Sequence, residues 1–66
     1  MITIRINGEP VPLPGEAPLA QILAERQVHG SFAVAVNTEF VPRAAYPTRV
    51  LRDGDDVEIV APMQGG

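Results

Sequence analysis

Alternating isoleucines followed at once by an Asn-Gly pair constrain the fold of this chain more than any other feature. The segment Ile2–Ile6 alternates isoleucine with polar residues, which is the pattern of a strand buried on one face. Asn7-Gly8 tolerates positive φ at both central turn positions, so we expect a β-hairpin whose second strand is Glu9–Leu13. The prolines within and just after that strand lack backbone N–H donors, which predicts that it lies at a sheet edge.

The next part of the chain predicts one helix. Residues 18–27 have apolar side chains at helical spacing, with Pro18 at the first helical position and Gly30 marking the end. Residues 32–36 then predict a strand with Phe32, Val34 and Val36 toward the core.

Residues 40–41, 49–52 and 57–59 predict further short extended segments, and residues 42–47 predict a single helical turn or a packed loop. If the first and last strands pair, they are parallel, because the helix between them is a crossover. We therefore expect an α+β fold of the β-grasp type, with a small mixed sheet over one main helix. The expected domain spans residues 1–60, and residues 61–66 form a flexible tail.

Composition narrows the function to a carrier or an interaction module. The chain has 66 residues and no cysteine, which excludes a disulfide, a thiolate metal site and a thiol nucleophile. A net charge of −3 argues against nucleic-acid binding. The amino end has no secretory pattern and no stretch is long enough to span a bilayer, so we expect a soluble, cytoplasmic protein with no membrane partner.

The terminal Gly65-Gly66 pair is the strongest candidate for a chemically reactive site. Glycine lacks a Cβ, so an arm ending in this pair can enter a narrow cleft of another protein. The terminal carboxylate is a poor electrophile until it is activated, for example by adenylation with ATP. Because the sequence has no phosphate loop and no basic cluster, the activating machinery belongs to a partner. A disordered end is the alternative interpretation.

Four other features each have two interpretations. The acidic run at residues 53–56 indicates a hairpin turn around Gly54 rather than a calcium loop, which needs more oxygen ligands. His29 lies just after the helix, where a capping or solvated role is favoured over a catalytic one.

Arg43 is either a surface arginine or a partner contact. Four apolar residues are predicted on the sheet face away from the helix: Ala33, Ala35, Val60 and Met63. They form either a docking site or single exposed apolar side chains with no common role.

Three segments together resemble the ThiS family of ubiquitin-like sulfur carriers in thiamin biosynthesis. These are residues 36–43 (VNTEFVPR), residues 51–60 (LRDGDDVEIV) and residues 63–66 (MQGG), and residues 6–9 (INGE) are similar too. The likeness covers essentially the whole chain. The Gly-Gly end and the Asp-Gly-Asp turn are shared with the small subunit of molybdopterin synthase, whereas the Val-Pro-Arg segment favours the thiamin branch.

The resemblance implies a specific chemistry. A ThiF-like enzyme would adenylate Gly66 with ATP and Mg²⁺, and a persulfide donor would then convert it to a thiocarboxylate. A ThiG-like thiazole synthase would take the sulfur. Gly65 would give clearance, and Arg43, Val60, Met63 and Gln64 are candidate partner contacts. The chain would be a co-substrate with no tightly bound cofactor or metal. The alternatives are a molybdopterin-type carrier and a ubiquitin-like binding module with an inert end.

Overall fold

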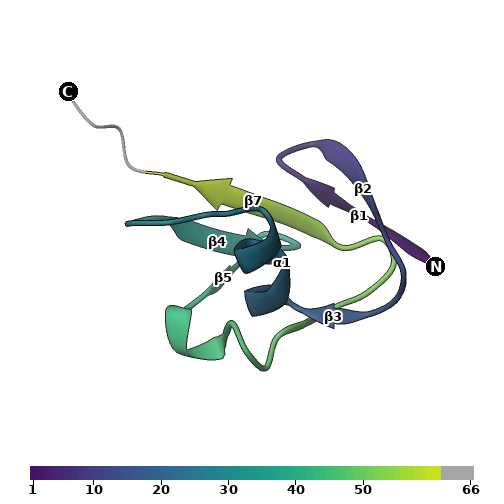
Figure 1. Ribbon diagram of the computed structural model, residues 1–66. Helices are drawn as coiled ribbons and strands as arrows, with labels where there is room; N and C mark the ends of the chain where they lie inside the picture. The colour runs from purple at the N-terminus through teal and green to yellow at the C-terminus, as the bar shows by residue number, and fades with distance from the viewer. Residues whose placement is uncertain (62–66) are drawn as a thin grey trace.

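The structure is a computed structural model that describes residues 1–61, so the predicted tail beyond Ala61 lies outside the described residues. Figure 1 shows the arrangement of the elements. In chain order they are β1 (Ile2–Ile6), β2 (Glu9–Leu13), β3 (Ala17–Pro18), α1 (Leu19–Glu25), β4 (Ala33–Val36), β5 (Glu39–Val41), the 3-10 turn η1 (Arg43–Ala45), β6 (Val50–Leu51) and β7 (Asp56–Val60).

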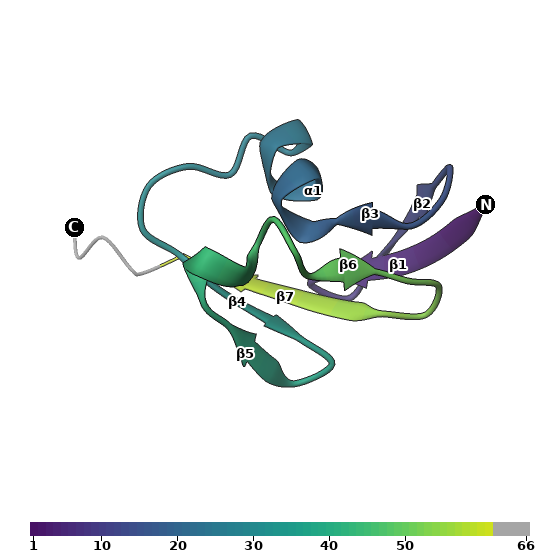
Figure 2. The ribbon, with the colours of Figure 1, turned by 90° about the horizontal axis from the view of Figure 1, so that it is seen from below.

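Five strands form one mixed sheet in the order β2-β1-β7-β4-β5, and α1 packs on one face of it (Figures 1 and 2). The first and last strands are parallel neighbours, with Ile6 beside Val57, and the other pairs in this sheet are antiparallel. This confirms the predicted parallel pairing. A mixed sheet with its two terminal strands side by side and one helix across it is the β-grasp fold.

The first hairpin is formed as predicted. Asn7 and Gly8 have φ of 51° and 86°, so both central turn residues adopt the left-handed conformation. Among the described strands β2 pairs only with β1, so it forms one edge of the sheet, where its prolines leave no ladder hydrogen bond unmade.

The helix is shorter than predicted at both ends. Pro18 is extended, with φ −68° and ψ 146°, because it pairs with Val50 in a separate two-stranded sheet of β3 and β6. At the other end Gln27, not Gly30, stops the helix, since its φ is 59°. The Gln27 N–H donates to the Ala24 carbonyl (3.1 Å) and the Val28 N–H to the Leu23 carbonyl (3.0 Å). This pair of bonds is the Schellman motif, here with glutamine at the left-handed position.

Two further turns connect strands of the sheets, and the second of them corrects a prediction. The β4–β5 turn has φ of 52° at Asn37 and 70° at Thr38, so it is a hairpin turn of the same hand as the first, without glycine. The turn around Gly54, whose φ is 86°, is not a hairpin, because β6 before it pairs with β3 and not with β7. Residues 42–47 contain the predicted single helical turn, η1.

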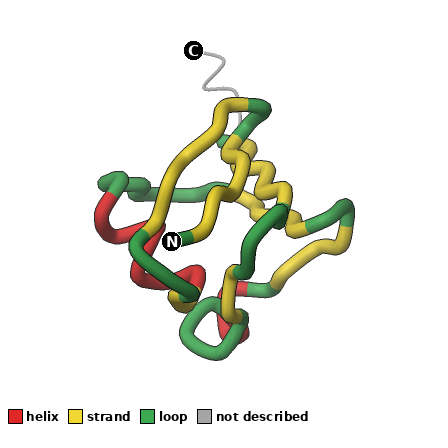
Figure 3. The backbone as a smooth tube through the Cα atoms, turned by 90° about the vertical axis from the view of Figure 1, so that its right-hand side faces the viewer, coloured by secondary structure: helices red, strands yellow, loops and turns green. Residues whose placement is uncertain are grey.

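The core lies between α1 and the main sheet. Figure 3 shows the backbone of these two layers from another side. The fully buried side chains of the core come from both layers and from β6: Ile4, Leu19, Val34, Val36, Leu51 and Val57. Phe32 was predicted on the third strand but precedes β4 and packs partly buried against this core. Within residues 1–61, no helix is both long and apolar enough to cross a bilayer.

Candidate functional site

The end of β7 bears most directly on the predicted carrier residue. Gly66, Gly65, Gln64 and Met63 lie outside the described residues, so the structure positions the base of the segment that leads to them. β7 ends at Val60, at the end of the sheet opposite the turn around Gly54 (Figure 1). Because β7 lies between β1 and β4, its backbone is hydrogen bonded on both sides.

The side chain of Asn7 extends this bonding beyond the end of β1. The Asn7 N–H donates to the Val57 carbonyl (2.8 Å), as a strand residue would. Its side-chain Oδ1 then accepts from the Ile59 N–H (2.8 Å), and its Nδ2 donates to the Ile59 carbonyl (3.2 Å). One amide side chain therefore replaces a missing strand partner for β7, one residue before Val60. Sequence reasoning assigned Asn7 only to the turn. The one sequence signal for a further role of Asn7 was that it lies in the INGE segment, which resembles the ThiS family.

An apolar surface lies beside the end of β7 on the sheet face away from α1. We call Ala33, Ala35, Phe40 and Val60 the outer patch. Ala33 is opposite Val60, and Ala35 is opposite Phe40, so the four share one face. Phe40 is 69% exposed and Val60 61% exposed, although both are large apolar residues. The predicted common face of Ala33, Ala35 and Val60 is confirmed, whereas the predicted fourth member, Met63, lies outside the described residues.

Phe40 is the member of this patch that sequence reasoning did not identify. Its neighbour Val41 is 5% exposed and faces the core, so the alternation of β5 turns Phe40 outward. That alternation is readable from the sequence once Val41 is known to be the inward residue of the pair.

Arg43 and Val60, two predicted partner contacts, are not brought together. Arg43 is exposed and begins η1, where it lines a groove with Leu23 of the helix and Tyr46. Val60 belongs to the outer patch on the other face of the sheet. His29 lines the same groove as Arg43 and is exposed.

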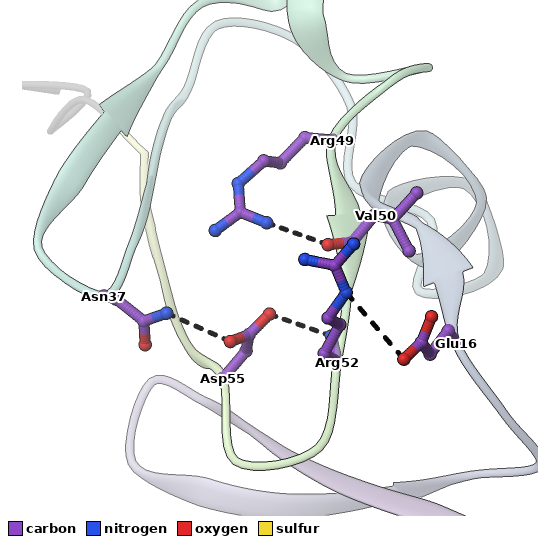
Figure 4. Close-up of polar contacts among 6 residues, drawn as sticks. All are labelled: Glu16, Asn37, Arg49, Val50, Arg52 and Asp55. Atoms are coloured by element: carbon purple, nitrogen blue, oxygen red, sulfur yellow. Dashed lines mark hydrogen bonds and ion pairs between the residues drawn. The ribbon is translucent and has the colours of Figure 1, made fainter.

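The acidic turn is a hydrogen-bonded structural unit. Asp53 accepts from the Thr3 N–H (2.8 Å). Figure 4 shows the Asp55 carboxylate accepting from the Arg52 N–H (2.8 Å) and from Nδ2 of Asn37 (3.0 Å). These bonds tie the turn to β1 and to the β4–β5 turn. In the part of the chain that the structure describes, no group of three metal-ligating side chains is placed to hold an ion.

Comparison with known proteins relates this arrangement to one family. The model of the ThiS family matches residues 4–66, which include all of the described fold from Ile4 onward and the Gly-Gly pair. The chain belongs to the ThiS family. It is 48% identical over 62 residues to the sulfur carrier protein ThiS of Thermus thermophilus, covering 92% of this chain and 95% of that protein.

Solved structures of this family agree with the fold. The crystal structure of the thiamine biosynthesis protein ThiS from Geobacter metallireducens has a TM-score of 0.84 with this chain at 28% identity, over 98% of this chain and 100% of that one. The solution structure of the Geobacter protein gives a TM-score of 0.80, over 98% of this chain and 88% of that one. The β-grasp architecture described above is thus that of ThiS family members.

Proposed function

We propose that this ThiS family member is a sulfur carrier for thiazole formation in thiamin biosynthesis. The observation that supports this most strongly is the family match through Gly66, together with 48% identity to a protein named as a sulfur carrier. In this proposal residues 1–60 are the folded domain, and residues 61–66 present the Gly66 carboxylate to other proteins.

The chemistry at Gly66 proceeds in three steps. The carboxylate attacks the α-phosphate of ATP, and pyrophosphate leaves, which converts a poor acyl electrophile into a reactive acyl adenylate. The terminal sulfur of a persulfide donor then attacks the acyl carbon and displaces AMP, which leaves an acyl disulfide. A thiol reduces the S–S bond of this disulfide, forming a new disulfide with the donor's sulfur and releasing the thiocarboxylate on Gly66. Gly65 leaves room for the partner's active site to close around the backbone.

The chain is a co-substrate and not a catalyst. ATP and Mg²⁺ are used by a ThiF-like adenylating enzyme, and a ThiG-like thiazole synthase receives the sulfur. No nucleic acid or membrane takes part, and the reaction is cytoplasmic. The outer patch supports docking of such partners, because Phe40 and Val60 expose apolar surface beside the strand that leads to Gly66. Met63 and Gln64 lie between that patch and Gly66 in the sequence and are proposed to contact the same partners.

Reconstituted thiazole synthesis tests this function. The chain is incubated with the adenylating enzyme, ATP, Mg²⁺, a persulfide donor, a thiol reductant and thiazole synthase. The small-molecule substrates that supply the carbon and nitrogen atoms of the ring are added, and thiazole product is measured. We expect product only when the chain is present, and none with a variant that carries one extra residue after Gly66. Equal product from the extended variant would contradict the proposal, since that variant has no carboxylate on Gly66.

A further inference from the structure

A preformed groove lies on the helix side of the molecule and is separate from the outer patch. It has a volume of about 460 Å³ and is lined by α1, by the connection from α1 to β4 and by the η1 segment. Figure 2 shows that this connection and the segment after β5 lie at the end of the molecule where β7 ends. A partner that binds the chain at the end of β7 can therefore also contact this groove.

The walls of the groove are fixed by hydrogen bonds and stacking. The Ala20 N–H donates to the Tyr46 carbonyl (3.0 Å), which ties α1 to the segment after η1. The rings of Phe32 and Tyr46 are stacked, with centroids 6.0 Å apart and planes 15° from parallel. Val28 is held by its bond to Leu23 at the end of the helix. These apolar residues give a groove that does not have to form before it binds a ligand.

The ionisable side chains that line the groove include basic residues but no acidic residue of the described chain. These charged or chargeable lining residues are Arg43, His29 and Tyr46, and none of the carboxylates within residues 1–61 lines the groove. Arg43 and His29 are both exposed, and the one salt bridge within residues 1–61 joins Arg52 to Glu16, away from the groove. In a chain with a net charge of −3, an apolar groove that has an arginine and no acid is complementary to an anionic apolar ligand.

We propose that this groove binds a segment of a partner protein in which a carboxylate stands next to a large apolar side chain. The apolar side chain packs on Leu23, Phe32 and Tyr46, and the carboxylate pairs with the Arg43 guanidinium, which has the fork geometry for bidentate binding. His29 is a second donor at the rim. The composition of this segment is inferred from the groove residues alone. That the segment belongs to the adenylating enzyme rests in addition on the proposed function.

Peptide titration followed by amide NMR tests the chemistry without any sulfur transfer. The probe is the acetylated and amidated tetrapeptide of sequence LDLE, and the control is its neutral counterpart LNLQ. We expect LDLE to shift the amide signals of Leu23, Phe32 and Tyr46, and to bind at least about tenfold more tightly than LNLQ, as a charge-assisted hydrogen bond of about 1.5 kcal/mol requires. Equal affinities, no shifts at millimolar peptide, or shifts confined to the outer patch would overturn the proposal.

Variants of the full chain test the partner. Arg43→Gln removes the cation, and Ala24→Glu adds an acid to the exposed groove wall on α1, where glutamate is a good helix former. We expect both to weaken binding to the adenylating enzyme about fivefold or more. The matched control Arg52→Gln also loses an exposed arginine and should change binding less than twofold. If all three variants bind and accept sulfur like the parent chain, the groove proposal fails while the proposed function stands.

One rival occupant is the carboxylate of this chain itself. If adding a residue after Gly66 changes the Leu23 and Phe32 signals with no peptide present, the occupant is internal and the partner proposal is overturned. We expect those signals to be unchanged by the addition.

Discussion

Asn7 combines two structural roles that sequence reasoning separates. Its left-handed backbone makes the first turn, which the Asn-Gly pair predicts. Its side chain also bonds both backbone groups of Ile59, which is 52 residues away in the chain. A local pattern reports the turn, because turn preference depends on neighbouring residues. It cannot report the second role, because that contact exists only after β1 and β7 have paired.

Substituting Asn7 separates these roles. Asn7→Gly keeps the left-handed backbone but removes the side chain, so we expect hydrogen exchange at the Ile59 amide to accelerate about tenfold, as the loss of one net hydrogen bond of about 1.4 kcal/mol implies. Asn7→Asp is the matched control, because it retains the oxygen that accepts from the Ile59 N–H. Similar exchange rates in the two variants would show that the side chain does not hold the end of β7.

At the level of elements, most strands and the helix are readable from periodicity, and the ends of the helix are not. Pro18 was expected at the first helical turn but pairs with Val50, since β6 is a tertiary partner that no local pattern reveals. Gln27 ends the helix in a conformation usually given to glycine, so the glycine signal at Gly30 misled the prediction. The separate β3–β6 sheet also explains why the turn around Gly54 is not a hairpin.

The helix end provides a stability test. Gln27→Gly relieves the left-handed strain of about 1 kcal/mol, partly offset by the greater freedom of glycine in the unfolded chain. We expect a gain of about 0.5 kcal/mol and a rise in melting temperature of about 2–4 °C. The control Arg26→Gly lies at φ −88°, where glycine relieves nothing, and should lower the melting temperature. Thermal unfolding followed by circular dichroism measures both, and a fall for both variants would refute this account of the helix end.

For the whole molecule, the fold places two surfaces of different chemistry around the end of β7. The outer patch is apolar and lies on one face of the sheet, and the groove with Arg43 lies on the helix side. Sequence reasoning listed Arg43 and Val60 together as partner contacts. The structure places them on different sides of the molecule, with Val60 on the outer face of the sheet and Arg43 in the groove beside α1. The Gly-Gly end and the family likeness were visible in the sequence, because they are local signatures. Most of the outer patch was also predicted, but Phe40 was not, because its exposure depends on which side of β5 faces the core. The groove was not predicted, because it exists only where α1 and the η1 segment pack beside each other.

If the outer patch is a docking surface, a charge introduced into it should weaken partner binding and leave the folded domain intact. Ala33→Asp places a charge opposite Val60 on an exposed position, so we expect stability to change by less than about 1 kcal/mol. Binding to the adenylating enzyme or thiazole synthase should weaken about tenfold or more, because an unpaired carboxylate would be buried at an apolar contact. Ala44→Asp is the control, since Ala44 is also exposed but lies in η1, outside both surfaces. Calorimetric binding that is equally weak for both variants would argue against a specific role for the patch.

Intact mass spectrometry of the chain after incubation with the adenylating enzyme, ATP, Mg²⁺, a persulfide donor and a thiol reductant tests the central claim most directly. The Thermus thermophilus relative in a parallel reaction serves as the positive control. The account predicts that this chain exchanges one oxygen for one sulfur, that fragmentation locates the sulfur at Gly66, and that omission of ATP prevents the exchange. An unchanged mass while the relative is thiolated, or sulfur located at any other residue, would contradict it.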